Sequence, residues 1–105
     1  LWDPGNNCWC HELAFPDGYE EVRDGYLGHI HIKDVFVDTP KATLTVKEMG
    51  QGQLGPLFED MAAALRKDQY KGVISFESVY HPGNGNFEDG FRKCIGKFKS
   101  LFGVD

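Results

Sequence analysis

The sequence has no long apolar run and no excess of positive charge. None of its hydrophobic stretches approaches the roughly 18 residues that a membrane-spanning helix requires, and no signal-peptide pattern is present. Lysine and arginine together number 11, against 16 aspartates and glutamates, which gives a formal net charge of −5. Nucleic-acid binding usually shows a basic patch or a high pI. Neither a nucleic acid nor a membrane is therefore an expected partner.

Cysteine is also scarce. Cys8, Cys10 and Cys94 make an odd count. The spacing of the first two is too tight for an ordinary disulfide framework, and no second cysteine pair is present to complete a zinc site. We expect three reduced thiols in a cytoplasmic protein. We also expect that Cys8, Cys10 and the nearby His11 are not metal ligands.

The chain has 105 residues, of which 41% are hydrophobic and 26% charged. These values are typical of one globular unit and exclude a disordered tail. The sequence lacks an initial Met and opens on "LWD", which reads as part of a strand. We therefore expect residues 1–105 to belong to one domain and to begin partway through it.

Strand-like and helical segments alternate along the chain. The predicted strands are residues 1–3, 26–37 and 72–79. The predicted helices are a short one that opens near Pro16 and carries Tyr19, Val22 and Tyr26, a second over 56–68, and a third over 87–102. Residues 38–55 are rich in Thr and Gly and have no sustained period, so they are predicted to be a long loop. A βαβαβα order predicts an α/β fold with parallel strands joined by right-handed crossovers.

The stretch "GHIHIKD" (28–34) alternates polar and apolar residues. Because successive side chains of a strand point to opposite faces, His29, His31 and Lys33 share one face. Ile30 and Ile32 share the other. An ordinary strand with its isoleucines in the core would show the same pattern, so this stretch alone does not establish a functional site.

Metal-ligand residue types recur at the ends of the predicted strands. Asp3, His31 and Glu77 each stand at or near the carboxyl end of a strand, where parallel α/β folds place their active sites. Each has a structural explanation when taken singly: a turn, a satisfied core histidine, a cap. Their recurrence at one strand position favours a divalent-metal site.

The motifs "LWDPGN", "GHIHIKD", "MGQGQLG" and "GVISFES", in this order and spacing, resemble the xylose-isomerase-like TIM-barrel superfamily of sugar-phosphate isomerases and epimerases. The resemblance covers essentially the whole chain. It implies that residues 1–105 form the C-terminal portion of a (β/α)8 barrel, about strands six to eight. A complete barrel takes about 250 residues.

The resemblance implies a metal site and a reaction. Asp3, His31 and Glu77 match the aspartate, histidine and last-strand glutamate that hold the family's divalent ion, and Glu77 matches one of two glutamates that move a proton at the sugar carbon. A further glutamate is expected from a fourth strand outside this sequence. The ion stabilises the developing oxyanion, and a carboxylate removes the proton next to the carbonyl. The donor set favours Mn²⁺, with Mg²⁺, Co²⁺ or Zn²⁺ as alternatives.

The resemblance also implies substrate contacts, with a small sugar or polyol as the partner. Asn6 stands where many members carry a histidine; its amide can bond a hydroxyl but cannot act as acid or base. His29 and Lys33 are further candidates, and the "HIKD" form of the motif resembles the inositol-catabolic branch. The alternative for Lys33 is a structural ion pair with Asp34 or another acidic neighbour. The alternatives for the function are a keto-inositol dehydratase-like lyase and a non-catalytic barrel fragment that binds a ligand or partner.

Three strands of a barrel would leave one sheet face uncovered. We expect Leu1 and Val73 to be exposed on that face and two sheet edges to be unpaired. Such a piece is expected to belong to a larger barrel or to associate as a homo-oligomer. Without the fourth-strand glutamate, we expect residues 1–105 alone to bind metal weakly or not at all and to lack isomerase activity.

Overall fold

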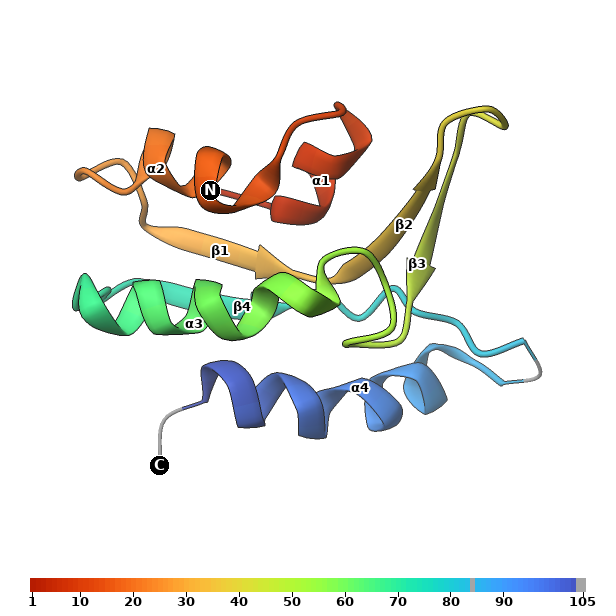
Figure 1. The fold of residues 1–105 in the computed structure, drawn as a ribbon. Helices are drawn as coiled ribbons and strands as arrows, with labels where there is room; N and C mark the ends of the chain where they lie inside the picture. The colour runs from red at the N-terminus through yellow and green to blue at the C-terminus, as the bar shows by residue number, and fades with distance from the viewer. Residues whose placement is uncertain (84, 104–105) are drawn as a thin grey trace.

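The computed structural model describes residues 1–83 and 85–103, and it shows a mixed α/β fold built around a small parallel sheet (Figure 1). The strands are β1 (His29–Ile32), β2 (Asp34–Asp38), β3 (Thr43–Lys47) and β4 (Val73–Phe76). β1 pairs in parallel with β4, and β2 pairs antiparallel with β3 in a separate sheet. The predicted α/β class with parallel strands is thus confirmed, although the chain also contains an antiparallel hairpin.

Trp2 extends the parallel sheet by one bridge, to Ile30. Trp2 exchanges backbone hydrogen bonds with His29 and His31, whereas the β4 side of β1 uses the carbonyls of Gly28 and Ile32. Because alternate residues of β1 bond to opposite sides, Trp2 and β4 flank it. The three predicted strands are therefore neighbours, with β1 in the middle.

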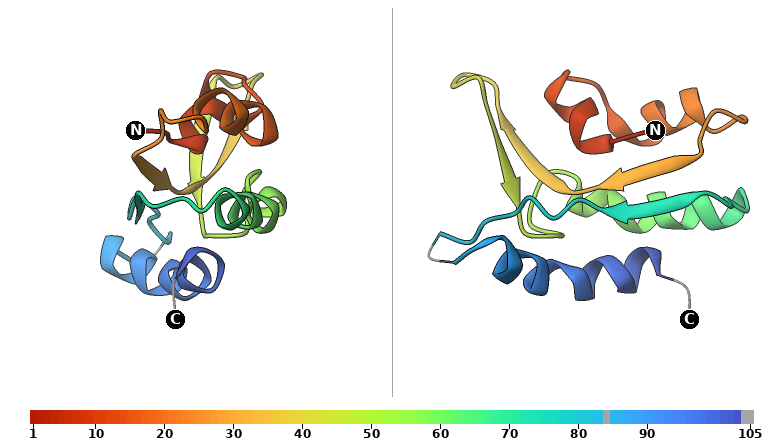
Figure 2. Two further views of the ribbon diagram at one scale, coloured as in Figure 1. Left: turned by 90° about the vertical axis from the view of Figure 1, so that its left-hand side faces the viewer. Right: turned by 180° about the vertical axis from the view of Figure 1, so that it is seen from behind.

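The helices are α1 (Pro4–Trp9), α2 (Tyr19–Val22), α3 (Phe58–Lys67) and α4 (Phe87–Phe102), with shorter helical turns over Ala14–Gly18 and Gly55–Leu57. α1 and α2 lie on one side of the β1–β4 pair and α4 on the other, with α3 alongside the strands (Figures 1 and 2). None of the helices in the described part of the chain is long and apolar enough to cross a membrane.

The core lies where the apolar sheet face meets α3 and α4. Ile30 and Ile32 have no exposed surface, as the alternation of the strand predicts. α3 buries residues at i, i+3, i+4 and i+7, which form one helical stripe: Phe58, Met61, Ala62 and Leu65. Burying one such large side chain contributes about 1.5–3 kcal/mol, so this stripe fixes α3 against the strands.

α4 confirms the predicted third helix at both ends. It begins with a capping box, in which the Asn86 side chain accepts from the N–H of Asp89 and the Asp89 carboxylate accepts from the N–H of Asn86. Its later turns pack through aromatic contacts, Phe98 on Phe76 and Phe102 on Phe58. The first turns are less covered than the periodicity predicted, because Phe87 is 56% and Phe91 40% exposed.

The predictions for residues 26–37 and 38–55 were wrong in detail. The first is not one strand: β1 ends at Ile32, and β2 starts at Asp34 with a different partner. The second is not a loop throughout, because Thr43–Lys47 forms β3. The alternating Thr and Val of "TLTVK" suit a strand, but the surrounding Gly and Thr residues obscured this pattern.

The N-terminal helices also differ from the prediction. Pro4–Trp9, which the sequence suggested was a turn, forms α1 with Asp3 as its N-cap and Pro4 in its first turn. The predicted helix near Pro16 is shorter than expected. α2 ends at Val22, and Tyr26 is 80% exposed beyond it.

Candidate metal centre

The parallel register brings three candidate ligands to one edge of the sheet. Trp2 and Ile30 lie opposite each other, and Asp3 and His31 follow them by one residue. Phe76 pairs with Ile32, and Glu77 continues this ladder by donating its N–H to the Ile32 carbonyl at 2.9 Å. Asp3, His31 and Glu77 therefore lie on one face, at the carboxyl ends of the Trp2 bridge, β1 and β4, as the sequence predicted.

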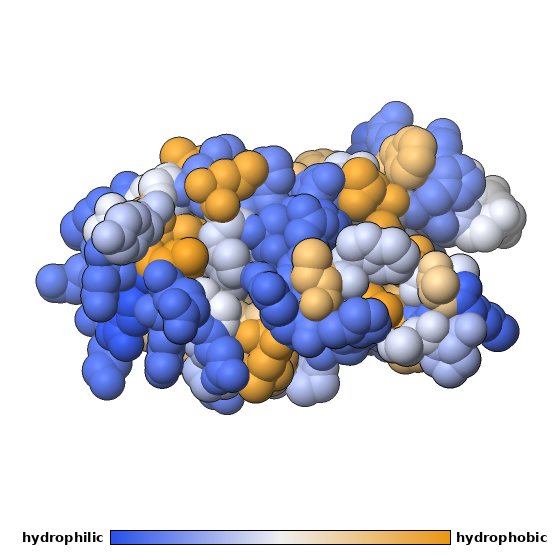
Figure 3. Space-filling view, turned by 90° about the horizontal axis from the view of Figure 1, so that it is seen from above, coloured by the Kyte–Doolittle hydropathy of each residue, from blue (hydrophilic) through white to orange (hydrophobic). Residues whose placement is uncertain are grey.

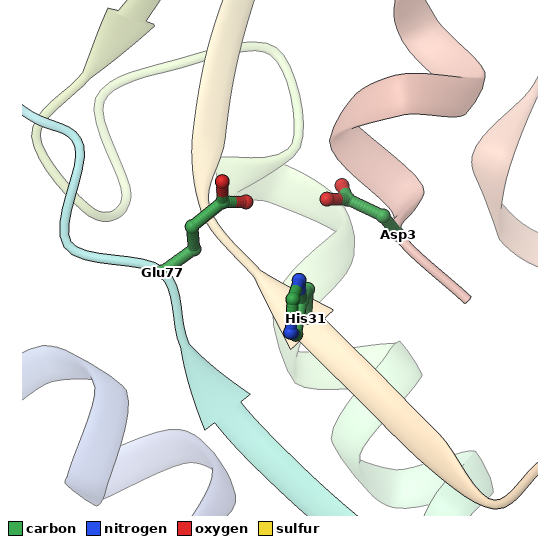
Figure 4. Close-up of side chains that lie close together, drawn as sticks. All are labelled: Asp3, His31 and Glu77. Carbon is green, nitrogen blue, oxygen red and sulfur yellow. The ribbon is translucent and has the colours of Figure 1, made fainter. Parts of the chain in front are cut away.

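Their side chains converge (Figure 4). One ligand atom from each of Asp3, His31 and Glu77 lies within 4.8 Å of the others, and all three residues are half-buried. Figure 4 shows the two carboxylates facing each other across the end of β1, with the His31 ring beside them.

The two carboxylate oxygens of Asp3 have different roles. Oδ1 accepts a hydrogen bond from the backbone N–H of Asn6 at 3.1 Å and so caps α1. Oδ2 faces the centre, and only 9% of the side chain is exposed. The cap fixes the carboxylate plane and leaves one oxygen for a ligand.

Lys33 lies between the two carboxylates. Its Nζ donates to Asp3 Oδ2 at 2.6 Å and to Glu77 Oε2 at 2.7 Å, and the residue is only 6% exposed. Burial lowers the pKa of the ammonium, but the hydrogen bonds and negative charges of both carboxylates outweigh burial and raise the pKa above its ordinary value. The amine is thus held in its charged form. Of the alternatives that the sequence left open, the structure shows an ion pair with acidic residues that are far away in the sequence, Asp3 and Glu77, and not with Asp34.

Gly5 gives the lysine stem its path, a role that the sequence analysis missed. A Cβ at Gly5 would lie 3.0 Å from both Cγ and Cε of Lys33. The first turn of α1 therefore passes directly over the methylene groups of Lys33 and steers the ammonium toward the carboxylates. A glycine within the first turn of α1, two residues after the capping Asp3, is the one indication in the sequence.

The other two predicted substrate-contact residues are placed differently. His29 lies on the same face, but its Nε2 is 2.7 Å from Ser75 Oγ and its ring packs edge-on to His31 at 5.0 Å between centroids. Asn6 lies in the first turn of α1 with its side chain exposed. The structure thus sets His29 beside the centre and Asn6 at its rim.

The neighbouring Asp34 anchors a loop instead of the centre. It is 1% exposed, and its carboxylate accepts four backbone N–H bonds of 2.9–3.0 Å, from Val35, Gly50, Gly52 and Leu54. Burial raises the pKa of this carboxyl, and the four N–H donors oppose the rise without cancelling it. The "MGQGQLG" segment is therefore held by its backbone, next to the centre.

The three cysteines are free, with Cys8 and Cys94 buried and Cys10 exposed. Burial raises the pKa of the Cys8 thiol, which disfavours the thiolate that a metal requires. Over residues 1–83 and 85–103, the metal-type cluster of Asp3, His31 and Glu77 includes neither a cysteine nor His11.

The donor set fits a hard divalent cation. Two carboxylates and one imidazole are ligand types that divalent cations accept. Both carboxylates are nevertheless already paired with Lys33. Comparison with known proteins finds no matching family model, curated protein or solved structure. The centre is therefore interpreted from its own geometry.

Proposed function

We propose that the protein is a divalent-metal-dependent sugar or sugar-phosphate isomerase or epimerase, and that this chain supplies the C-terminal part of a xylose-isomerase-like barrel. The observation that carries the proposal is the convergence of Asp3, His31 and Glu77 at the carboxyl ends of β1 and β4 and of the bridging residue Trp2. The spatial order of these strands also supports it, because consecutive strands of a barrel are neighbours.

The roles follow from the positions of the side chains. Asp3, His31 and Glu77 would hold the ion, which would act as a Lewis acid on the substrate carbonyl. Glu77 is the more exposed of the two carboxylates: 34% of its side chain is accessible, against 9% for Asp3. Glu77 therefore serves as the base that removes and returns the proton on the carbon next to the carbonyl.

The substrate is a small sugar or polyol. Asn6 at the rim can bond a hydroxyl, and His29 presents an imidazole beside His31. Lys33 supplies a cation to a carbonyl, carboxylate or phosphate oxygen. A second glutamate ligand, from a strand outside these residues, completes the proposed centre.

Solvent exchange tests this function. The full-length protein, loaded with Mn²⁺, is incubated in D₂O with ketoses, ketose phosphates and a keto-inositol, and deuterium incorporation next to the carbonyl is followed by NMR. We expect exchange with at least one substrate, and Glu77→Gln should slow it by about 100-fold or more. Glu88→Gln is the matched control, because it makes the same change on the exposed first turn of α4 and should leave exchange unaltered.

Other outcomes select the alternatives. Loss of water from the keto-inositol would indicate a dehydratase that uses the same centre. Metal binding with neither exchange nor water loss would indicate a barrel segment that binds a ligand without converting it, and would contradict the proposed activity.

A further inference from the structure

The ammonium of Lys33 occupies the space between two of the candidate ligands. Its Nζ is within 2.7 Å of one oxygen on each of Asp3 and Glu77. These are the carboxylates that, with His31, form the metal-type cluster. The same two carboxylates thus bind the Lys33 ammonium and are candidate ligands for a divalent metal ion.

The two cations compete for the same charges. A lysine ammonium and a divalent ion a few ångströms apart repel each other, and burial reduces the screening of that repulsion by water. A carboxylate that coordinates a metal also has less negative charge to offer a hydrogen-bond donor. Lys33 has a flexible four-carbon stem, whereas Asp3 is fixed by its capping bond to Asn6. The lysine is therefore the group able to move.

We propose that Lys33 and the divalent ion are alternative occupants of the Asp3–Glu77 pair, so that metal uptake is an exchange of one cation for another. The proposal rests on the proposed function, because it describes how that function's metal site is filled. In the metal-free state, the ammonium keeps the two carboxylates together and compensated. When the metal binds, the ammonium leaves, and its N–H donors become free for an oxygen of the substrate.

Calorimetric titration of the full-length protein and its variants with Mn²⁺ tests the exchange. Lys33→Gln removes the internal cation, so we expect the variant to bind Mn²⁺ about tenfold or more tightly than the unaltered protein. Lys41→Gln is the matched control: it removes the same charge from an exposed position in the turn between β2 and β3 and should leave the affinity unchanged.

Chemical labelling provides a second readout that needs no variant. Lys33 is 6% exposed and doubly paired, so its acetylation should be slow without metal. Saturating Mn²⁺ should speed acetylation of Lys33 several-fold, as measured by peptide mass spectrometry, while Lys41 in the same sample serves as the unchanged reference.

The outcomes separate this proposal from the proposed function. Equal or weaker Mn²⁺ binding by Lys33→Gln, or a Lys33 that stays protected at saturating Mn²⁺, would overturn the exchange and leave the isomerase proposal standing. Tighter binding with faster labelling, but without deuterium incorporation or water loss from any substrate, would support the exchange and overturn the catalytic proposal. If neither the protein nor Lys33→Gln binds Mn²⁺, both are overturned.

Discussion

Lys33 and Asp34 are adjacent in the chain, opposite in charge and both buried, yet they do not pair with each other. Lys33 bonds to the side chains of Asp3, at the start of α1, and Glu77, just after β4. Asp34 bonds to backbone N–H groups, three of them in residues 49–55. The switch from one sheet to the other occurs between these two residues, since β1 ends at Ile32 and β2 begins at Asp34.

The comparison separates two ways of compensating a buried charge. The partners of Lys33 are two side-chain carboxylates, a group that can also bind another cation. The partners of Asp34 are peptide groups, which are fixed by the course of the chain and lose their hydrogen bonds if the carboxylate is removed. We infer that Lys33 belongs to an exchangeable site and that Asp34 belongs to the fold.

Asp34→Ala should have the largest effect on stability. It removes the acceptor of four buried or part-buried N–H bonds, and we expect it to lower the free energy of unfolding by about 3 kcal/mol or more. Urea denaturation measures the change. Asp24→Ala is the control, because Asp24 is exposed and its removal should change stability by less than about 0.5 kcal/mol. Equal losses in the two variants would contradict the anchoring role.

Gly52→Ala should have the next largest effect on stability, because the loop packs closely against Asp34 at this position. An added Cβ would lie 2.6 Å from the Val35 carbonyl oxygen and closer still to the Asp34 carboxylate. We expect a loss of about 2 kcal/mol by urea denaturation. Gly96→Ala is the control: nothing lies within 4 Å of its new methyl group in α4, so it should stabilise the helix by about 0.5–1 kcal/mol. A neutral Gly52→Ala would mean that the loop can move away from Asp34.

The sequence predicted those parts of the fold that depend on local periodicity. Ile30 and Ile32 alternate with polar residues and are fully buried, and Leu1 and Val73 on the opposite face are 76% and 57% exposed. The β2–β3 hairpin was missed because the surrounding Gly and Thr residues obscured the alternation of β3, and the role of Asp34 as an anchor was missed for a different reason. Asp34 binds N–H groups 16–20 residues away, and a partner that is backbone leaves no mark on residue type.

The candidate site was also predictable in part: the sequence predicted which ligands meet, but not where the Lys33 ammonium lies. The positions of Asp3, His31 and Glu77 at the ends of predicted strands were enough to predict that they meet, because the strand register brings all three to one edge of the sheet. The position of the Lys33 ammonium was not determined by alternation, which fixes the face of a side chain but not where its far end lies. That position depends on the gap left by Gly5, a contact between α1 and the end of β1.

Asp3→Asn and Glu77→Gln should give smaller and unequal losses, because the two carboxylates differ in burial. The Asp3 side chain is 9% exposed and that of Glu77 is 34% exposed. We expect about 1–2 kcal/mol for Asp3→Asn, since its partner ammonium is buried, and less than about 1 kcal/mol for Glu77→Gln, whose charge is better screened by water. Asparagine preserves the cap of α1, so the loss reports on Lys33.

Double-mutant cycles with Lys33→Met isolate each pair from its surroundings. The coupling energy of Lys33 with Asp3 should exceed that with Glu77. The reverse order would place the main stabilisation of the ammonium at the exposed carboxylate and weaken the inference that Asp3 is the fixed half of the site.

The Tyr19 hydroxyl is a buried neutral group and makes the third case. Tyr19 is 3% exposed, and its hydroxyl donates to Asp68 Oδ2 at 2.5 Å. Burial and this hydrogen bond to a carboxylate raise the pKa of Tyr19 from 10.0 to about 12. Because the folded state holds the proton more tightly than the unfolded state, the resulting stabilisation is complete below pH 10 and is lost as the pH rises through about 12.

Ultraviolet titration of the tyrosines checks this directly, with ionisation of Tyr19 expected about two pH units later than in the unfolded chain. Tyr19→Phe should remove that late step, whereas Tyr26→Phe, at a side chain that is 80% exposed, should leave it in place. A late step that survives in Tyr19→Phe would assign it to another residue. Disappearance of the late step in Tyr19→Phe would assign that step to Tyr19. Tyr19 then resists titration through its burial and its one acceptor, whereas Lys33 keeps its charge through two carboxylates that, in our proposal, a metal ion can also bind.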